Sequence, residues 1–372
     1  MFATAKGEIE RAFELDPADP EIIRVRSGYL SNSAEKIAAL EKYLALASNA
    51  DPEDVTGVRD SISFFREKGD RKLCTLSSPH ENAVIPLQGV SEDAKNNWAF
   101  GLKVLFNGKK SVKLVLDTGA SGVTLKRSLA QTLGVRMAGS VNVRGVGDSG
   151  ARRSAMGFVD QLSVGSVEFR DCPVVFVEKL GMSGADGVIG PDIFSRFLVT
   201  IDNPKRSLRL AAVMKPRNKG EFVDREVTDA NRGFTPVYSI GSHLFLPTRV
   251  NSTGPMLFVI DTGAYSNLIS EKQARTVSKV RANRDSTIRG ASGQVQKTFS
   301  VDEAILQFAT FEQRHRGMPS FDFSGLSRAF GIEVSGLLGM SALELMSLTI
   351  DYTNGMVDMK YTPKVEPVFK RQ

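Results

Sequence analysis

The chain carries one short stretch twice, as Lys113-Leu114-Val115-Leu116-Asp117-Thr118-Gly119-Ala120-Ser121 and as Met256-Leu257-Phe258-Val259-Ile260-Asp261-Thr262-Gly263-Ala264-Tyr265-Ser266. In each copy, an apolar run typical of a buried β-strand leads directly into Asp-Thr-Gly-Ala. Asp117 and Asp261 are therefore 144 positions apart (261 − 117). Each carboxylate is expected at a strand end in apolar surroundings, where an ionised side chain is costly unless it is paired or hydrogen-bonded.

Further landmarks follow both Asp residues in the same order. The apolar-Gly motif Asp186–Gly190 has its counterpart in Ser335–Gly339. A Thr-Ile-Asp triplet begins ten residues after each motif, at Thr200 (200 − 190) and at Thr349 (349 − 339). A glycine-rich stretch also lies between the Asp and the apolar-Gly motif of each copy. These landmarks, repeated in one order, predict two duplicated lobes.

The duplicated motifs resemble those of aspartic proteases. Asp-Thr-Gly-Ala in each half is similar to retropepsins, and two halves in one chain are similar to pepsins. The resemblance covers roughly residues 80 to 365 and implies a mainly β, bilobal fold with two duplicated β-barrel-like lobes. We place these lobes at residues 80–214 and 230–365, with their boundary in the charged stretch 215–233. A small α-helical segment, residues 1–73, is expected to precede them.

The resemblance implies that Asp117 and Asp261 are a catalytic pair. Ionising two carboxyl groups at hydrogen-bonding distance is energetically costly, so the two groups share one proton. The Asp pair of aspartic proteases is the well-known example. The ionised Asp takes a proton from water while the protonated Asp polarises the scissile carbonyl. The expected protein is an aspartic endopeptidase that uses no metal or cofactor and binds an extended peptide or protein substrate. The alternative is a non-catalytic peptide-binding or scaffold protein with the same fold.

The residues that follow each Asp are expected to support the pair. By resemblance, the two threonines hydrogen-bond to the backbone of the opposite lobe, and the two glycines let main-chain donors approach the carboxylates closely. The two alanines stand where pepsins usually carry Ser or Thr, so a hydroxyl that would stabilise the ionised pair is missing. We therefore expect a pH optimum nearer neutral than that of pepsins. These supporting residues are Thr118, Gly119, Ala120, Thr262, Gly263 and Ala264.

The glycine-rich stretches, Arg144–Gly147 and Arg289–Gly293, are expected to form loops that close over the substrate. Glycine at matched offsets permits the backbone conformations that a closing loop needs. The resemblance therefore implies two mobile flaps where pepsins have one. The residues expected to contact substrate are Gly145, Val146, Gly147, Gly290 and Ala291.

Other signals lack the context that would give them meaning. Residues 145–150 match G-x-G-x-x-G, but no helix-forming stretch follows, so a dinucleotide site is not expected. The same stretch contains Gly-Asp-Ser-Gly, but no His lies in a matching serine-protease motif. His80, His243 and His315 are dispersed, which also argues against a zinc site. We expect all three at surface or structural positions.

The N-terminal residues show apolar side chains at helical spacings. The Asp-Pro pairs at Asp16 and Asp51 lie 35 residues apart (51 − 16), which resembles tetratricopeptide repeats. One to two repeats fit, whereas about three are normally needed to stand alone. The segment is either a docking module for a protein partner or the remnant of a longer array packed on the lobes, and we favour the second interpretation.

Composition bounds the remaining possibilities. The 372 residues, 41% hydrophobic and 24% charged, predict two or three packed units. The net charge of +6 is scattered without interleaved aromatics, which disfavours nucleic-acid binding, and no apolar run reaches the length of a membrane span. Residues 1–20 lack an apolar signal core, so the protein is either cytoplasmic or a leader has been removed.

The two cysteines, Cys74 and Cys172, provide no disulfide framework, and whether they pair is open. A monomer with one intramolecular Asp pair is expected; the alternative is that each lobe pairs with its counterpart in a second chain.

Overall fold

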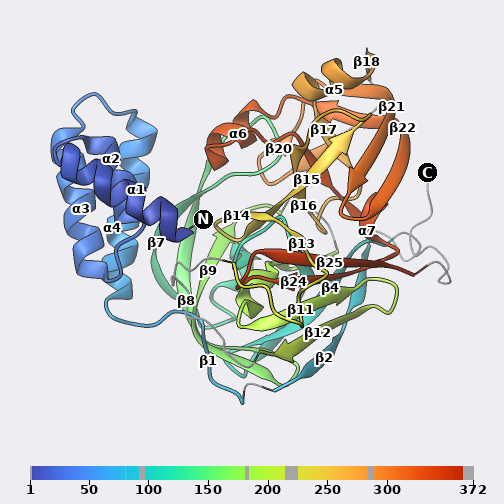
Figure 1. Cartoon of the computed structure of the whole chain (residues 1–372). Helices are drawn as coiled ribbons and strands as arrows, with labels where there is room; N and C mark the ends of the chain where they lie inside the picture. The colour runs from blue at the N-terminus through green and yellow to red at the C-terminus, as the bar shows by residue number, and fades with distance from the viewer. Residues whose placement is uncertain are drawn as a thin grey trace.

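A computed structural model describes residues 2–79, 81–91, 97–180, 184–213, 225–283 and 288–362. A group of N-terminal helices stands beside two β-rich lobes (Figure 1). Within the described ranges, no helix combines the length and the apolarity that a bilayer-spanning helix requires.

The N-terminal helices form a small unit with a core of its own. They are α1 (Phe2–Leu15), α2 (Pro20–Ser27), α3 (Ser33–Leu46) and α4 (Pro52–Lys68). Asp19 starts α2 by accepting the N–H of Ile22 at 3.0 Å, and Asn32 starts α3 by accepting the N–H of Glu35 at 2.8 Å. The apolar faces meet in a cluster formed by Ile23, Leu40, Tyr43, Val58 and Ile62.

The first lobe is a closed barrel. Its strands are β3 (Gln88–Ser91), β4 (Asn97–Phe106), β5 (Lys110–Leu116), β6 (Val123–Lys126), β7 (Arg136–Val143), β8 (Arg152–Val164), β9 (Val167–Val177) and β10 (Gly187–Ile189). The order β4-β5-β10-β6-β9-β8 closes on itself because β8 pairs with both β9 and β4. Asn107 and Gly108 lie in the turn from β4 to β5 with φ angles of 50° and 63°, as is typical of an Asn-Gly hairpin.

The second lobe repeats this barrel. Its strands are β14 (Tyr238–Ile240), β15 (His243–Val250), β16 (Met256–Ile260), β17 (Leu268–Ser270), β18 (Val280–Ala282), β19 (Arg289–Gly290), β20 (Gly293–Gln294), β21 (Phe299–Phe308), β22 (Phe311–Phe321) and β23 (Gly336–Leu338), with helices α5 (Glu271–Val277), α6 (Ser324–Phe330) and α7 (Met340–Leu343). The order β15-β16-β23-β17-β22-β21 closes through β15 and β21, and both barrels contain two parallel pairs at matched places. The predicted duplication is confirmed.

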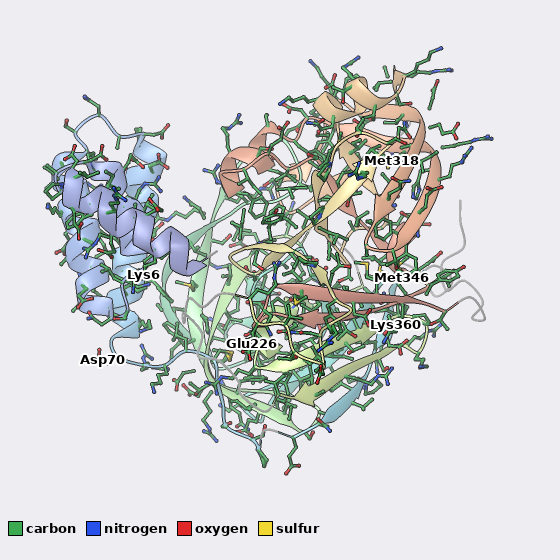
Figure 2. All side chains as sticks on the ribbon, viewed as in Figure 1. Lys6, Asp70, Glu226, Met318, Met346 and Lys360 are labelled. Atoms are coloured by element: carbon green, nitrogen blue, oxygen red, sulfur yellow. A yellow bond between two sulfur atoms is a disulfide. The ribbon has the colours of Figure 1, made fainter. Side chains whose placement is uncertain are left out.

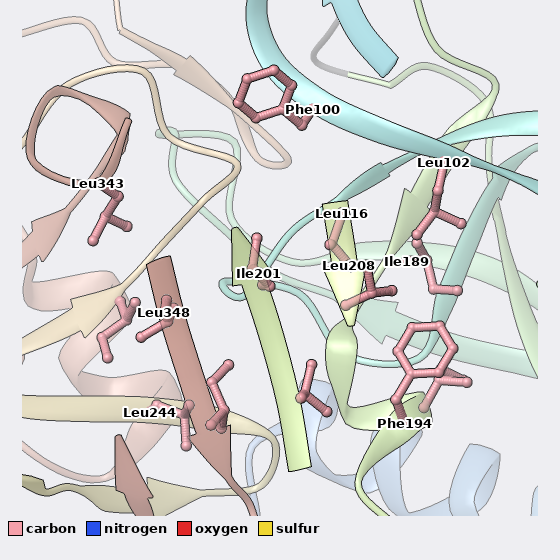
Figure 3. Packing of buried hydrophobic residues seen from close by; sticks show 14 of the residues in the cluster. Phe100, Leu102, Leu116, Ile189, Phe194, Ile201, Leu208, Leu244, Leu343 and Leu348 are labelled. Atoms are coloured by element: carbon pink, nitrogen blue, oxygen red, sulfur yellow. The ribbon is translucent and has the colours of Figure 1, made fainter. Parts of the chain in front are cut away.

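A six-stranded sheet joins the lobes. Its order is β13 (Thr235–Pro236), β25 (Met356–Tyr361), β24 (Met346–Asp351), β11 (Phe197–Asp202), β12 (Ser207–Ala212) and β2 (Ala83–Pro86). The two Thr-Ile-Asp triplets pair with each other at its centre, where the hydroxyls of Thr200 and Thr349 lie 3.0 Å apart. One apolar cluster continues across both lobes, and Figure 3 shows Ile201 and Leu348, which face each other in this pairing. The boundary expected at 215–233 lies partly outside the described residues; β12 ends at Ala212 and β13 begins at Thr235.

A disulfide connects the helical unit's exit to the first lobe. The chain leaves α4 near Asp70, labelled in Figure 2 at the foot of the helices. Cys74 and Cys172 then form a disulfide with Cα atoms 4.1 Å apart, which answers the question that the sequence left open. The short strand β1 (Thr75–Leu76) continues from there and pairs with β9.

The helical unit packs on the β7–β8 hairpin through α4. The rings of Phe64 and Phe158 stack with centroids 5.9 Å apart, and the guanidinium of Arg71 lies 4.8 Å from the centroid of the Phe158 ring. Arg153 of β8 forms an ion pair of 2.7 Å with Asp60 of α4. This hairpin carries the first glycine-rich stretch, so the helices support the base of that stretch.

Candidate active site

The two Asp residues occupy the same position in each barrel. Asp117 follows β5, and its N–H donates to the carbonyl of Ile189 at 3.0 Å. Asp261 follows β16, and its N–H donates to the carbonyl of Leu338 at 2.9 Å. In both lobes, the backbone of the turn is therefore bonded to the parallel neighbour strand, β10 or β23. Each Asp-bearing strand is paired on both sides, which fixes the position of its end.

The fold brings Asp117 and Asp261 together. Their carboxyl groups are hydrogen-bonded to each other, and both residues remain partly exposed to solvent. A Cβ atom added at Gly119 would lie 2.7 Å from the carboxyl carbon of Asp261, and one added at Gly263 would collide equally with Asp117. Glycine is therefore required at both positions for the carboxylates to meet.

The two threonines hold the turns together from below. Thr118 donates its hydroxyl to the carbonyl of Ile260 at 2.7 Å, and Thr262 donates its hydroxyl to the carbonyl of Leu116 at 2.9 Å. Each hydroxyl also accepts the backbone N–H of the other threonine, at 2.9 and 3.0 Å. Both side chains are buried, so these cross-lobe bonds are shielded from water. The bonds match those that the family resemblance implied.

Backbone N–H groups donate hydrogen bonds to both carboxylates. Oδ1 of Asp117 accepts the N–H of Gly119 at 2.8 Å. Oδ1 of Asp261 accepts two N–H groups of its own turn, from Gly263 and Ala264, each at 3.0 Å. The N–H of Gly263 also acts on Asp117, and hydrogen bonds of this kind favour the ionised form of both carboxylates.

The pKa values of the pair follow from this arrangement. Burial raises the pKa of Asp117 well above its usual value, and the charge and hydrogen bond of Asp261 raise it further. Burial also raises the pKa of Asp261, but the hydrogen bond from Asp117, the two backbone N–H groups and the charge of His243 act in the opposite direction. Both carboxyl groups therefore have raised pKa values, and the charge of His243 acts on Asp261.

The two glycine-rich stretches meet each other. We call residues 144–151, between β7 and β8, the first tip, and residues 289–294, which include β19 and β20, the second tip. Ser292 joins them: its hydroxyl accepts the N–H of Gly145 at 3.0 Å and donates to the carbonyl of Gly150 at 2.8 Å. Its N–H donates to the carbonyl of Val146 at 2.9 Å, and its carbonyl accepts the N–H of Ser149 at 2.9 Å.

Close packing accompanies these bonds. A Cβ atom added at Gly145 would lie 2.7 Å from that of Ala291, and one added at Gly290 would lie 2.6 Å from the carbonyl oxygen of Val146. Gly147 has φ +128° and packs on the Ser292 backbone, a combination that a side chain would not permit. All five residues expected in the flaps thus lie at this contact between lobes. Their mobility stays a prediction.

Sequence reasoning missed two residues. Ser292 lies within the second stretch and is 1% exposed, but a serine in a glycine-rich run carries no distinctive signal. The imidazole Nε2 of His243 lies 3.0 Å from the carbonyl oxygen of Gly119, beside the Asp pair, although we expected a surface or structural role. His315 does have structural partners, Asn267 and Gln313, whereas His80 lies outside the described residues. In the part of the chain that the structure describes, no group of three or more His, Cys, Asp and Glu side chains is arranged to hold a metal ion.

Comparison with known proteins bears on the fold. A family model described as aspartyl protease matches residues 102–193, the greater part of the first lobe. The solved structure of the aspartic proteinase from Irpex lacteus is similar over 78% of this chain and 100% of that chain, with a TM-score of 0.47 and 13% identity. No curated protein matches the sequence. Together with the paired barrels and the joining sheet, the family match identifies the mainly β, bilobal aspartic-protease fold.

Proposed function

We propose that the protein is an aspartic endopeptidase with Asp117 and Asp261 as its catalytic residues. The observation that carries the proposal is the hydrogen bond between these two carboxyl groups, which come from matched turns of two lobes and remain partly exposed. Aspartic-protease chemistry requires two carboxyl groups that share one proton and can both reach the substrate. The cross-bonded threonines and the backbone N–H groups support that geometry.

The Asp pair can supply and accept every proton needed for peptide hydrolysis without a metal or a covalent intermediate. Water attacks the scissile carbonyl carbon and gives a proton to the ionised Asp, while the protonated Asp gives its proton to the carbonyl oxygen. The tetrahedral diol then collapses: the C–N bond breaks, the leaving nitrogen takes the proton that water lost, and a diol hydroxyl returns the other proton to the carboxylate. The pair ends in its starting state.

We also propose that the first and second tips act as two flaps over an extended substrate. Support comes from their matched places in the lobes and from the contacts of Ser292, which hold them against each other. Paired tips from both lobes favour a retropepsin-like arrangement within one pepsin-like chain. Release of these hydrogen bonds would be needed for long substrates to enter, as in other enzymes with closing loops.

For the tetratricopeptide-like helices, we propose a supporting role on the first lobe rather than partner docking as the main one. The packing of α4 on β7 and β8, through Phe64, Phe158 and the Asp60–Arg153 ion pair, favours this role. A docking role for a protein partner remains the alternative that deletion of the helices would reveal.

Digestion of a denatured protein mixture tests the proposed activity. The parent protein should cut it in a pepstatin-sensitive way, and Asp117→Asn or Asp261→Asn should each remove nearly all cleavage. Because the pair acts as one unit, the double variant should lose little more activity than either single variant. Peptide binding without cleavage by the parent would instead favour the non-catalytic alternative. Light scattering on the same proteins should find an active monomer; half-activity in each single variant would indicate two symmetric sites between chains.

A further inference from the structure

The register of the two barrels gives Asp117 and Asp261 different neighbours. In the second lobe, Phe245 pairs with Val259, and continuing this register by two residues places His243 opposite Asp261. In the first lobe, Gly101 pairs with Val115, and the same continuation places Ala99 opposite Asp117. His243 and Ala99 are 144 positions apart (243 − 99), the same offset as the Asp residues. The two lobes therefore differ at the matched position opposite each Asp, which is His243 in the second lobe and Ala99 in the first.

The imidazole of His243 crosses from the second lobe to the turn of the first. Its Nε2 lies 3.0 Å from the carbonyl oxygen of Gly119. A carbonyl oxygen only accepts hydrogen bonds, so Nε2 carries a proton and donates. The methyl group of Ala99 offers no such donor to the opposite turn. The bond thus binds one Asp turn, and its counterpart is missing from the other.

Apolar residues of α6 and β14 lie beside His243. The ring of Phe330, from α6, contacts the imidazole edge-to-face with centroids 4.8 Å apart, and β14 places Ile240 in register with His243. Asp261 is the carboxylate on which the imidazole charge acts directly. In α6, the basic residue Arg328 is exposed to solvent. The aromatic contact and the hydrogen bond to Gly119 therefore fix the orientation of the ring.

We propose that His243 is a positioning residue that makes the pair asymmetric, so that Asp261 is the general base and Asp117 the proton donor. This inference rests on the proposed endopeptidase function. In the attack step, water then loses its proton to Asp261 as the new C–O bond forms, and the proton of Asp117 passes to the carbonyl oxygen. Backbone N–H groups lower the pKa of both carboxyl groups, so we assign the asymmetry to His243.

Two substitutions separate the charge of His243 from its hydrogen bond. His243→Ala installs the residue found at the matched position and removes both, whereas His243→Gln keeps an N–H donor and removes the charge. The charge of His243 lowers the pKa of Asp261 and so favours its ionised form. Loss of that charge should move the acid limb of kcat/KM to higher pH, on the order of one pH unit, in both variants. His315→Ala, which removes a histidine bonded to Asn267, is the matched control and should leave the limb in place.

Carboxyl carbon NMR titration of the pair provides a readout that needs no turnover. The first deprotonation step should move to higher pH in His243→Ala and His243→Gln, and the carbon that titrates in this step should belong to Asp261. An unshifted acid limb and an unshifted titration in both variants would overturn the role of His243. If the parent cleaves no protein but the titration shifts as expected, the endopeptidase proposal fails and the asymmetry stands. If His243→Ala does not fold, His243→Gln alone decides the question.

Discussion

Arg153 of β8 and Asp60 of α4 form an ion pair of 2.7 Å that joins the N-terminal helices to the hairpin carrying the first tip. The carboxylate side is largely buried, with 10% of the Asp60 side chain exposed. Phe64 and Phe158 stack beside it, so apolar and charged contacts act at the same place. The helices are therefore packed against the hairpin that carries the proposed first flap.

Deletion of residues 1–73 should lower stability or solubility more than peptide turnover, because it exposes the Phe158 surface and leaves Arg153 unpaired. Thermal unfolding and cleavage of a short peptide measure the two effects. Asp60→Asn is the matched local change and should cost about 1 kcal/mol of unfolding free energy. Intact stability with loss of cleavage of one native protein substrate would instead show that the helices dock a partner.

Asp117→Asn should stabilise the protein relative to the parent, and only above about pH 4. The raised pKa of Asp117 means that the folded state holds a proton that the unfolded state has released. The stability of the parent therefore falls as the pH rises from the pKa of Asp117 in the unfolded state towards its pKa in the folded state. The Asn variant does not show this loss of stability. Urea unfolding between pH 3 and pH 8 measures it. A difference that does not change with pH would contradict the prediction.

Restoring a hydroxyl beside the pair should extend activity to lower pH. Ala264→Thr adds a donor next to Asp261, and a hydrogen bond to the ionised carboxylate lowers its pKa. The acid limb of kcat/KM should move down by roughly half to one pH unit, the equivalent of a modest hydrogen bond to a charged group. Ala264→Val has nearly the same shape without the hydroxyl and should leave the limb unchanged. Equal shifts in both variants would indicate a packing effect.

Ser292→Ala should loosen the contact between the tips, because its hydroxyl both accepts from Gly145 and donates to Gly150. Amide hydrogen exchange at Gly145 should accelerate roughly five-fold, as expected for the loss of one hydrogen bond worth about 1 kcal/mol. Ser149→Ala is the control, since Ser149 bonds Ser292 through its backbone N–H. Unchanged exchange in Ser292→Ala would show that the hydroxyl does not hold the tips together.

Removal of the disulfide by the paired change Cys74→Ala and Cys172→Ala should lower the unfolding free energy by about 2–5 kcal/mol. The bond closes a loop with a sequence separation of 98, which restricts the unfolded chain. Urea unfolding of the parent with dithiothreitol should reproduce the variant. A variant as stable as the oxidised parent would rule out this contribution.

Local patterns in the amino-acid chain were sufficient to identify the strands that end in Asp117 and Asp261 and the duplication itself. Alternation of apolar residues, turn chemistry and a constant offset act over short distances or repeat along the chain, so they can be read without a partner segment. The resemblance to aspartic proteases then supplied the expected roles of Thr118 and Thr262.

The contacts between lobes could not be read in this way. The hydrogen bond between His243 and Gly119 and the one between Ser292 and Gly145 join residues 124 and 147 positions apart. Whether such residues touch depends on the relative orientation of two barrels, which is fixed by the joining sheet and its continuous apolar core. A histidine or a serine has no periodicity that could reveal such a partner. The contact of His243 with the turn of Asp117 was therefore decided by packing across the lobes.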